Sequence, residues 1–388
     1  MSNLIFNSVA TPAAPVAGKT KVYTKADNLL YAMGPDGIER SLMSPGVIPA
    51  NSVLSMFRNR LINGGMNINQ RGVGVVAGNS WAHNAYCMDR WYVQTETTSS
   101  SNVTAQQLLD PESIQTECLR LTQPDLLAKR IGVVQIIEGV NCRHMKGGAF
   151  TLSGRIRSSL AQNIKFAVLS NTGTQDTVTH NLINSWSSNN YTAANFFTAA
   201  IGTPTAIGTI NPVANVWTPF SLTGTFPAGL KNAVIFIWTE GTFAQTNTLD
   251  IGLVQLESGS TASSFEYRHF GMELALAQRY YWSSFPTGVL PVYGVQANKI
   301  QFCGSYESTG YYQPHHSQTW PVTMRATPTI QSYQTASTTA NEYSSAAGST
   351  YNWQFKTADC RGSSFMYSGN NSVSAVPWSF HLTADSDI

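Results

Sequence analysis

The chain has 388 residues, of which 42% are hydrophobic and only 11% are charged, and its formal net charge is +2. This length exceeds what one ordinary hydrophobic core accommodates, so the sequence predicts two or three domains. Because no cluster of Lys and Arg is present, the composition argues against nucleic-acid binding and against a polybasic membrane anchor. Because so few residues are charged, electrostatic repulsion between copies of the chain is weak, and this favours self-association.

Residues 1–47 are predicted to form a separate N-terminal arm. The proline-rich stretch Thr11–Pro15 should be extended, and the alternating segments 19–25 and 28–33 predict strands separated by a turn. A second turn at Pro35–Gly37 leads into another short strand. A meander of about three strands buries too little surface to be stable by itself, so we expect it to pair with other subunits.

Residues 48–60 are predicted to connect this arm to the main domain. Ser52 is a suitable N-cap for a short helix, in which Val53, Met56 and Phe57 share one face. The opening residues, 1–6, lack a basic region followed by a long apolar core, and they predict no signal peptide.

Residues 61–270 have the pattern of an antiparallel β-sandwich. Ala149–Arg157 alternates between apolar and polar residues, as a half-buried strand does, and Ala233–Trp238 is a strand-sized apolar run too short to span a bilayer. Seven or more such strands with Gly, Asn and Ser turns predict a jelly roll or sandwich. Gly271–Trp282 predicts an amphipathic linking helix, and residues 283–388 predict a small C-terminal β-sandwich. The expected fold class is therefore mainly β.

The five cysteines are expected to be scattered, mostly buried thiols in a protein that folds in a reducing cytoplasm, because their wide spacing forms no CxxC pair and predicts no zinc site. They are Cys87, Cys118, Cys142, Cys303 and Cys360.

Aromatic side chains in polar segments are the candidates for ligand binding. Sugars are recognised by aromatic faces that stack on ring C–H groups, flanked by amides that form hydrogen bonds. The candidate glycan-binding residues are Trp81, Tyr86, Trp186, Asn189, Asn190 and Tyr191. For each aromatic residue, packing in a core or an interface is the alternative. The tryptophans in strand patterns, Trp91, Trp217 and Trp238, are expected in the core. Arg90, between Asp89 and Trp91, is expected to pack flat against an aromatic ring or a backbone carbonyl.

No catalytic motif is present, and we expect no enzymatic activity. Glycoside hydrolysis needs two carboxylates about 5–10 Å apart, a separation that sequence does not give for the acids in or beside predicted strands. These acids are Glu117, Glu138, Glu257 and Glu266. His315 and His316 lie in a predicted loop, where they could bind a metal on a symmetry axis or simply be exposed. No cofactor or metal ligand is predicted. A structural calcium is left open but unsupported, because calcium needs clustered oxygen ligands and the sequence contains no acidic cluster.

Two motifs about two hundred residues apart bracket the predicted sandwich. The first is Asn63–Gly72, followed by Asp89–Trp91, and the second is Val254–Gly259, which leads into Ser264–Arg268 and Met272–Tyr281. With the order of the strand motifs between them, they resemble the jelly-roll module of bacteriophage tail-fibre and appendage proteins, which is similar to carbohydrate-binding modules. The arm, from Pro15-x-x-Gly-Lys onward, resembles the N-terminal hairpin segment of phage fibres.

The resemblance implies a phage virion structural protein, a fibre, tail-tip or appendage subunit that adheres to host-surface glycan without breaking a bond. The implied partners are further copies of the chain in a homotrimer, other virion proteins through residues 1–47, and host polysaccharide, with no membrane insertion. Such a protein would be synthesised and assembled in the host bacterial cytoplasm and located in the virion. Two alternatives remain: a head fibre, decoration or collar protein with a purely architectural role, and a polysaccharide-degrading enzyme.

Overall fold

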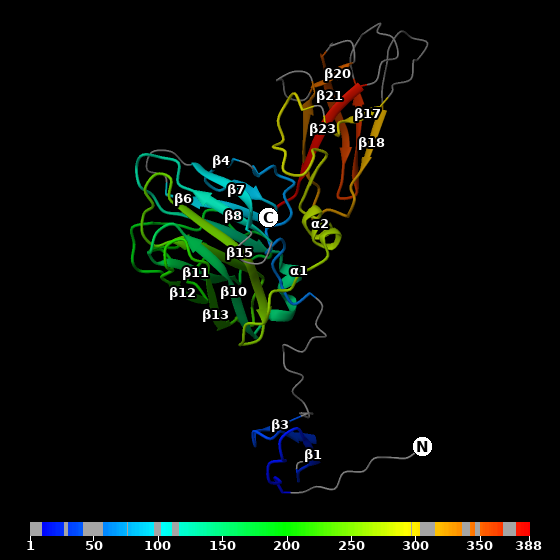
Figure 1. The fold of residues 1–388 in the computed structure, drawn as a ribbon. Helices are drawn as coiled ribbons and strands as arrows, with labels where there is room; N and C mark the ends of the chain where they lie inside the picture. The colour runs from blue at the N-terminus through cyan, green and yellow to red at the C-terminus, as the bar shows by residue number, and fades with distance from the viewer. Residues whose placement is uncertain are drawn as a thin grey trace, which may run out of the picture. The chain divides into compact units, whose positions relative to one another are not determined.

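The computed structural model describes residues 10–26, 30–41, 57–75, 77–96, 102–110, 116–295, 297–302, 315–335, 342–345, 350–367 and 378–388. Contacts divide the chain into two units, residues 1–56 and residues 57–388. The described part is mainly β, as predicted, and its sheets are antiparallel (Figure 1). No helix within it is long and apolar enough to cross a membrane.

The first unit contains a three-stranded sheet of β1 (Lys21–Thr24), β2 (Leu30–Met33) and β3 (Glu39–Ser41). This is the meander that the turn signals predict. Glu39 ties its edges together by accepting hydrogen bonds from Tyr23 and, at 2.6 Å, from Lys25. The predicted helix at Asn51–Arg60 falls mostly outside the described residues, and residues 57–60 are not helical.

The second unit begins with a sandwich of two six-stranded antiparallel sheets. The first sheet has the order β13-β10-β15-β8-β7-β4. Its strands are β4 (Asn79–Ala82), β7 (Asn102–Asp110), β8 (Thr116–Thr122), β10 (Ala149–Ser158), β13 (Thr218–Thr225) and β15 (Thr248–Ser258). The second sheet has the order β12-β11-β14-β9-β6-β5. Its strands are β5 (Tyr86–Met88), β6 (Trp91–Thr95), β9 (Ile131–Ile137), β11 (Ile164–Asn171), β12 (Ala206–Ile210) and β14 (Asn232–Thr239).

The second sheet is buried on both faces. Every residue of β9 and β14 is buried, and such continuous apolar runs are typical of strands covered on both sides. One face packs into the first core, which lies between the sheets. The opposite face packs into a second core, in which Phe196 stacks on Trp238 with ring centroids 5.4 Å apart. Most of this cover comes from residues 172–205, the connection between β11 and β12, which we call the covering segment.

The first sheet, in contrast, leaves part of its outer face open. β13 alternates strictly between exposed and less exposed residues, and β10 shows the same half-buried character in its second half. The half-buried strand predicted at Ala149–Arg157 is therefore confirmed, but its burial alternates only from Arg155 to Ser158, because Phe150, Thr151 and Leu152 are all buried. Trp91 and Trp238 are fully buried, as expected.

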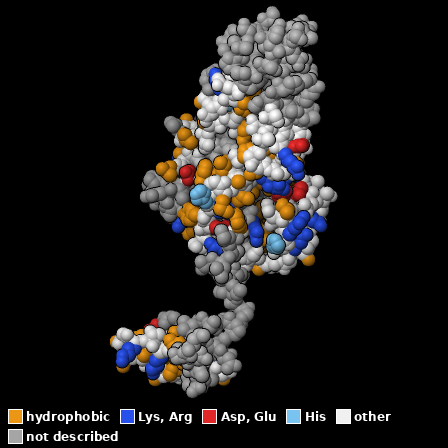
Figure 2. Space-filling view, turned by 90° about the vertical axis from the view of Figure 1, so that its right-hand side faces the viewer, with side chains coloured by type: hydrophobic (Ala, Val, Ile, Leu, Met, Phe, Trp, Pro, Cys, Tyr) orange, Lys and Arg blue, Asp and Glu red, His pale blue; other side chains and the backbone are white. Residues whose placement is uncertain are grey.

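Two short helices connect the parts of this unit. α1 (Gly139–Cys142) and a 3₁₀ turn (Arg143–Met145) join β9 to β10, whereas α2 (Phe270–Gln278) follows the sandwich. α2 ends earlier than predicted because Tyr281 and Trp282 enter a strand. The predicted amphipathic character is wrong, because the apolar residues of α2 are spread around its axis and one of its two buried residues is Glu273. The face that carries both helices shows gathered hydrophobic side chains (Figure 2). The exposed ones include Val140, Phe270 and Met272.

The C-terminal strands form an eight-stranded sheet around β23, which pairs with β16, β17, β19 and β20. Its strands are β16 (Tyr281–Ser283), β17 (Ile300–Phe302), β18 (His315–Thr319), β19 (Thr329–Gln334), β20 (Glu342–Ser345), β21 (Thr350–Ala358), β22 (Gly362–Tyr367) and β23 (Trp378–Asp385). His315 and His316 begin β18 and do not lie in a loop; their side chains lie outside the described set. Four cysteines are free thiols, of which Cys87, Cys118 and Cys142 are buried and Cys360 is half-buried, while Cys303 lies outside the described residues.

A buried charge cluster fixes the end of β23 to the sandwich. Arg71 and Arg90 both bind the Asp387 carboxylate, and the three side chains are almost fully buried. The Arg90 guanidinium lies 3.7 Å from the centroid of the Tyr280 ring and donates a 2.5 Å hydrogen bond to the Ile136 carbonyl. The expectation that Arg90 packs flat against a ring or a carbonyl is therefore confirmed.

Removal of the central charge in this cluster should destabilise the second unit strongly. Asp387→Asn leaves two buried guanidiniums without their shared carboxylate, and we expect a loss of about 3 kcal/mol. Asp385→Asn is the matched control, because Asp385 pairs with one arginine, Arg71, accepts a hydrogen bond from the Asp387 amide, and has a side chain that is 40% exposed; its loss should stay below about 1 kcal/mol. Urea unfolding followed by tryptophan fluorescence measures both, and equal losses would contradict the role assigned to Asp387.

Candidate functional site

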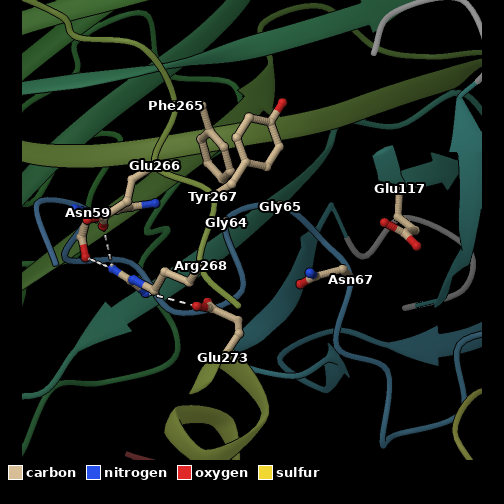
Figure 3. A pocket seen from close by; sticks show the side chains of 10 residues that line it. All are labelled: Asn59, Gly64, Gly65, Asn67, Glu117, Phe265, Glu266, Tyr267, Arg268 and Glu273. Atoms are coloured by element: carbon tan, nitrogen blue, oxygen red, sulfur yellow. Dashed lines mark hydrogen bonds and ion pairs between the residues drawn. The ribbon is translucent and has the colours of Figure 1, made fainter. Parts of the chain in front are cut away.

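The two sequence motifs that bracket the sandwich meet in space. The Val254 amide donates a 2.9 Å hydrogen bond to the Gly64 carbonyl, and the Glu273 carboxylate accepts one from the Asn63 amide. Arg268 binds the carbonyls of Asn59 and Leu61 and the Glu273 carboxylate. Figure 3 shows Arg268 pointing at Asn59 and Glu273, with the rings of Phe265 and Tyr267 lying side by side above it. These motifs are therefore one structural joint.

A groove of about 540 Å³ lies next to this joint, on the open face of the first sheet. Its floor is formed by β10 and β13, and one wall is formed by residues 262–267, which lie back across β15. That wall is held in place because Gln255 binds Ser263 and the Glu266 amide, while Glu257 accepts two hydrogen bonds from Ser263. The volume is within the range of roughly 300–1,000 Å³ that small ligands occupy.

A β-bulge shapes the groove floor. Ser153 pairs with Gln255 whereas Arg155 pairs with Gly252, so β15 carries one extra residue at this point. The extra residue places Leu253 at φ +52°, a left-handed conformation that costs a non-glycine residue free energy. Leu253 lines the groove as a result. Bulges commonly re-aim side chains beside binding sites.

Two aromatic rings form the exposed wall. Phe265 and Tyr267 contact each other edge to face with ring centroids 5.0 Å apart, and Tyr267 is 60% exposed. Both rings also line a second, much smaller cavity of about 40 Å³ on the side of the joint (Figure 3). A ring that is exposed yet supported by a neighbour can present a fixed face to a ligand.

Trp217 adds a third aromatic ring to the open face. A Cβ added at Gly252 would meet its ring at 3.8 Å, and the Arg157 guanidinium lies 5.0 Å from the ring centroid. The expectation of core packing is wrong for Trp217. The alternation of β13 explains this. Phe220 points into the core, so residues 217, 219 and 221 point to the opposite, outer face of the sheet.

The six residues predicted to bind glycan occupy three separate environments. Trp81, in β4, packs half-buried against the first core. Tyr86 donates a 3.3 Å hydrogen bond to the Ile388 carbonyl and lies 4.8 Å from the Arg71 guanidinium, within the charge cluster. Trp186, Asn189, Asn190 and Tyr191 lie together in the covering segment, where the two amides are exposed and the two aromatic rings both contact Phe196.

Tyr191 is held by a polar network. Its hydroxyl donates a 2.8 Å hydrogen bond to Glu240, which also pairs with Lys165 at 3.1 Å, and Lys165 lies 4.5 Å from the Tyr191 ring. Burial, together with this hydrogen bond, raises the pKa of Tyr191. Burial by itself would raise the pKa of Glu240, but hydrogen bonds from Tyr191, Asn163 and Lys165 bring it below its usual range. These contacts fix the covering segment to the second sheet, and sugar contact by Tyr191 stays a prediction.

The four acids singled out in the sequence bind or line parts of the protein itself. Glu138 binds Arg279 and Tyr280, Glu257 binds Ser263, Glu266 binds the amides of Arg58 and Asn59, and Glu117 lines the small cavity. Glu117, Glu266 and Glu273 share that cavity, but its 40 Å³ is far below the volume of a sugar site. Among the described residues, no three His, Cys, Asp or Glu side chains are close enough to hold a metal.

Sequence reasoning did not assign the groove residues. Tyr267 belongs to a recognised motif, but nothing local marks it as exposed beside β10. Arg155 stands in an ordinary alternating strand, and only the long-range pairing of β10 with β13 and β15 gives it its neighbours. The one sequence signal was the alternation itself, which implies an open face on this sheet.

No family model and no curated protein matches the sequence. The solved structures similar to the chain include the enzymatically active domain of bacteriophage CBA120 tailspike protein 4, at 15% identity and a TM-score of 0.32, covering 53% of this chain but only 22% of the tailspike chain. TmCBM61 in complex with β-1,4-galactotriose is 9% identical with a TM-score of 0.31, covering 52% of this chain and 99% of that one. A CBM4 module is 16% identical with a TM-score of 0.27, covering 51% and 98%. Similarities at these TM-scores assign no function.

The joint beside the groove depends on the absence of a side chain at Gly64. A Cβ there would lie 2.0 Å from the Val254 carbonyl oxygen, so Gly64→Ala must push the two motifs apart. We expect a loss of about 3 kcal/mol in the free energy of unfolding, from overpacking. Gly229→Ala is the control, because its Cβ would meet only Thr172 at 3.8 Å, and it should change stability by less than about 0.5 kcal/mol. Chemical denaturation measures the free energy of unfolding of both variants. An unchanged value for Gly64→Ala would show that the joint is not tightly packed.

Proposed function

We propose that this protein is a phage virion structural subunit, of the fibre, tail-tip or appendage kind, that adheres to host-surface glycan through the groove on the first sheet and breaks no bond. The observation that carries the proposal is the groove itself, with the supported, exposed ring of Tyr267 along its wall. Aromatic walls and short hydroxyl side chains are the chemistry that recognises sugars. The groove supplies these hydroxyls from Ser153 and Ser221.

The location of the groove supports binding rather than a core role for these rings. The second sheet is covered by the chain on its outer side, so a ligand has no access to it without displacing the covering segment. The first sheet keeps its outer face partly open. A partly open sheet face with a fixed aromatic wall suits an extended polymer, because successive sugar units can lie along the strands.

The virion role rests on the sequence motifs. The paired motifs around the sandwich and the small N-terminal meander both resemble phage fibre and appendage proteins. In this proposal residues 1–47 attach the protein to other virion proteins, and the protein assembles as a homotrimer in the bacterial cytoplasm. Three linked grooves would strengthen weak individual sites, because linked sites act at a high effective concentration.

An architectural subunit, such as a head fibre, decoration or collar protein, is the second candidate function. The apolar surface around α1 and α2 favours it (Figure 2). Phe270 is 49% exposed and Met272 is 39% exposed on one short helix, and contiguous exposed apolar side chains commonly mark protein–protein contacts. In that role the open groove would be filled by a neighbouring subunit.

Binding measurements on Tyr267 variants test the glycan proposal. Tyr267→Ala removes the ring, and we expect at least about a tenfold loss of affinity for host-surface polysaccharide. Tyr267→Phe keeps the ring and should retain most of the affinity. Because Tyr267 is exposed, both variants should unfold at the denaturant concentration of the unsubstituted protein.

Tyr191→Phe provides the comparison with the covering segment. It removes the hydrogen bond to Glu240 and should lower stability while leaving glycan affinity unchanged. Biolayer interferometry with immobilised polysaccharide from the host envelope measures all three variants. Unchanged affinity in Tyr267→Ala, or binding that Tyr191→Phe abolishes in a folded protein, would contradict the groove as the site.

A further inference from the structure

We propose that the glycan bound in this groove carries carboxylate groups, and that Arg155 is the residue that pairs with them. This inference rests on the proposed function and specifies its ligand class. It is carried by the position of Arg155 in the groove floor, by the absence, among the described residues, of a hydrogen-bond or ion-pair partner for its guanidinium, and by the pairing of the neighbouring charges.

The neighbouring arginines share one acid. Arg157, Asp250 and Arg120 lie directly opposite one another on β10, β15 and β8. Arg120 binds both Asp250 oxygens, at 2.7 and 2.8 Å, and Arg157 binds one of them at 2.8 Å. Asp250 is almost completely buried beneath these two side chains. Its carboxylate is therefore engaged by Arg120 and Arg157, and neither the hydrogen bonds nor the ion pairs of the described residues join it to Arg155.

Arg155 has no such acid. Its cross-strand neighbours are Pro219 on β13 and Gly252 on β15, and neither offers a side-chain acceptor. Within the described part of the chain, no hydrogen bond and no ion pair involves its guanidinium. Arg155 and Pro219 both line the aromatic-walled groove. A half-buried guanidinium in such a place has lost some of its hydrogen bonds to water, and the oxygens of a ligand anion can replace them.

The chemistry of the site favours a carboxylate. A guanidinium presents a planar fork that matches the two oxygens of a carboxylate, and the resulting bidentate pair is among the stronger hydrogen-bonded contacts. Three arginines against one aspartate give this part of the sheet face a net charge of 3 − 1 = +2. A polyphosphate backbone would need many more cations than one unpaired arginine provides. Sugar rings that carry carboxylates fit both the aromatic wall and the single guanidinium.

The carboxylates of the adjacent joint do not oppose this arrangement. Glu266 and Glu273 face the small cavity on the other side of Phe265 and Tyr267, and Arg268 binds both of them. Glu257 is buried and accepts hydrogen bonds from Ser263. Glu257, Glu266 and Glu273 are therefore already paired, whereas Arg155 in the groove floor has no ion-pair partner among the described residues. Glu117 also lines the small cavity but does not line the groove.

The test compares acidic polysaccharides with their own carboxyl-reduced forms. The probes are polygalacturonate, alginate, hyaluronan and polysialic acid, each before and after reduction of its carboxylates to alcohols, with dextran sulfate as an anionic polymer without carboxylates. The full-length protein should bind at least one carboxylated polymer about tenfold or more tightly than its reduced form and more tightly than dextran sulfate. Arg155→Gln should lower binding of that polymer to the level of the reduced form.

Two further variants separate the role of Arg155 from general charge. Arg155→Lys keeps the charge but loses the planar fork of the guanidinium. It should retain only part of the preference for the carboxylated polymer over its reduced form. Arg143→Gln removes an exposed arginine of the 3₁₀ turn, outside the groove, and should leave binding unchanged. All variants should show the same denaturation midpoint, because no hydrogen bond or ion pair between described residues is lost with the Arg155 guanidinium.

The outcomes distinguish this inference from the function on which it rests. Equal binding of carboxylated and reduced polymers that is still lost in Tyr267→Ala would overturn the acidic ligand and leave glycan binding intact. Equal binding of dextran sulfate, or a preference that survives Arg155→Gln, would overturn the carboxylate pairing. Absence of binding to all polymers and to host polysaccharide alike would overturn the proposed function as well.

Discussion

The burial of one sheet on both faces is the constraint on which the rest of the sandwich depends. β9, β11 and β14 carry apolar side chains on both sides, and water cannot be left against either side. The first sheet covers one side. The covering segment and residues around Tyr280 and Ile388 cover the other, so the chain builds a second core with its own aromatic stack of Phe196, Phe236 and Trp238.

This constraint decides where a ligand can bind. The covering segment closes the outer side of the second sheet, whereas the outer face of the first sheet is partly open, as the alternating exposure of β13 shows. There the bulge at Leu253, the wall from Ala262 to Tyr267 and the unpaired Arg155 meet in one groove. The joint between the two motifs fixes the wall, so the residues that give the sequence its phage resemblance also position the proposed site.

Local patterns were sufficient to predict the strands and the meander of the arm, since each depends on residues close in the sequence. The flat packing of Arg90 was predicted from its residue type, but the groups it contacts, the Tyr280 ring and the Ile136 carbonyl, are distant in the sequence. The candidate binding residues were harder to predict. Trp186 and Tyr191 stand among Ser and Asn residues and look exposed, yet they pack against Phe196 because the covering segment folds over a sheet whose strands are distant in the sequence. Conversely, Trp217 looks like a core residue but lies on the outer face. Arg155 and Tyr267 are 112 positions apart in the sequence, and only the register of β10, β13 and β15 places both along the same groove.

Hydrogen exchange measured by mass spectrometry, with and without a bound host polysaccharide, tests most directly whether the open sheet face is the binding face. Ligand contact slows amide exchange where it suppresses local opening. We predict slower exchange in peptides that cover 151–157, 217–223 and 262–268, with no change in 180–198 of the covering segment. Slower exchange confined to 180–198 would contradict the account and would return Trp186 and Tyr191 to the position of leading candidates.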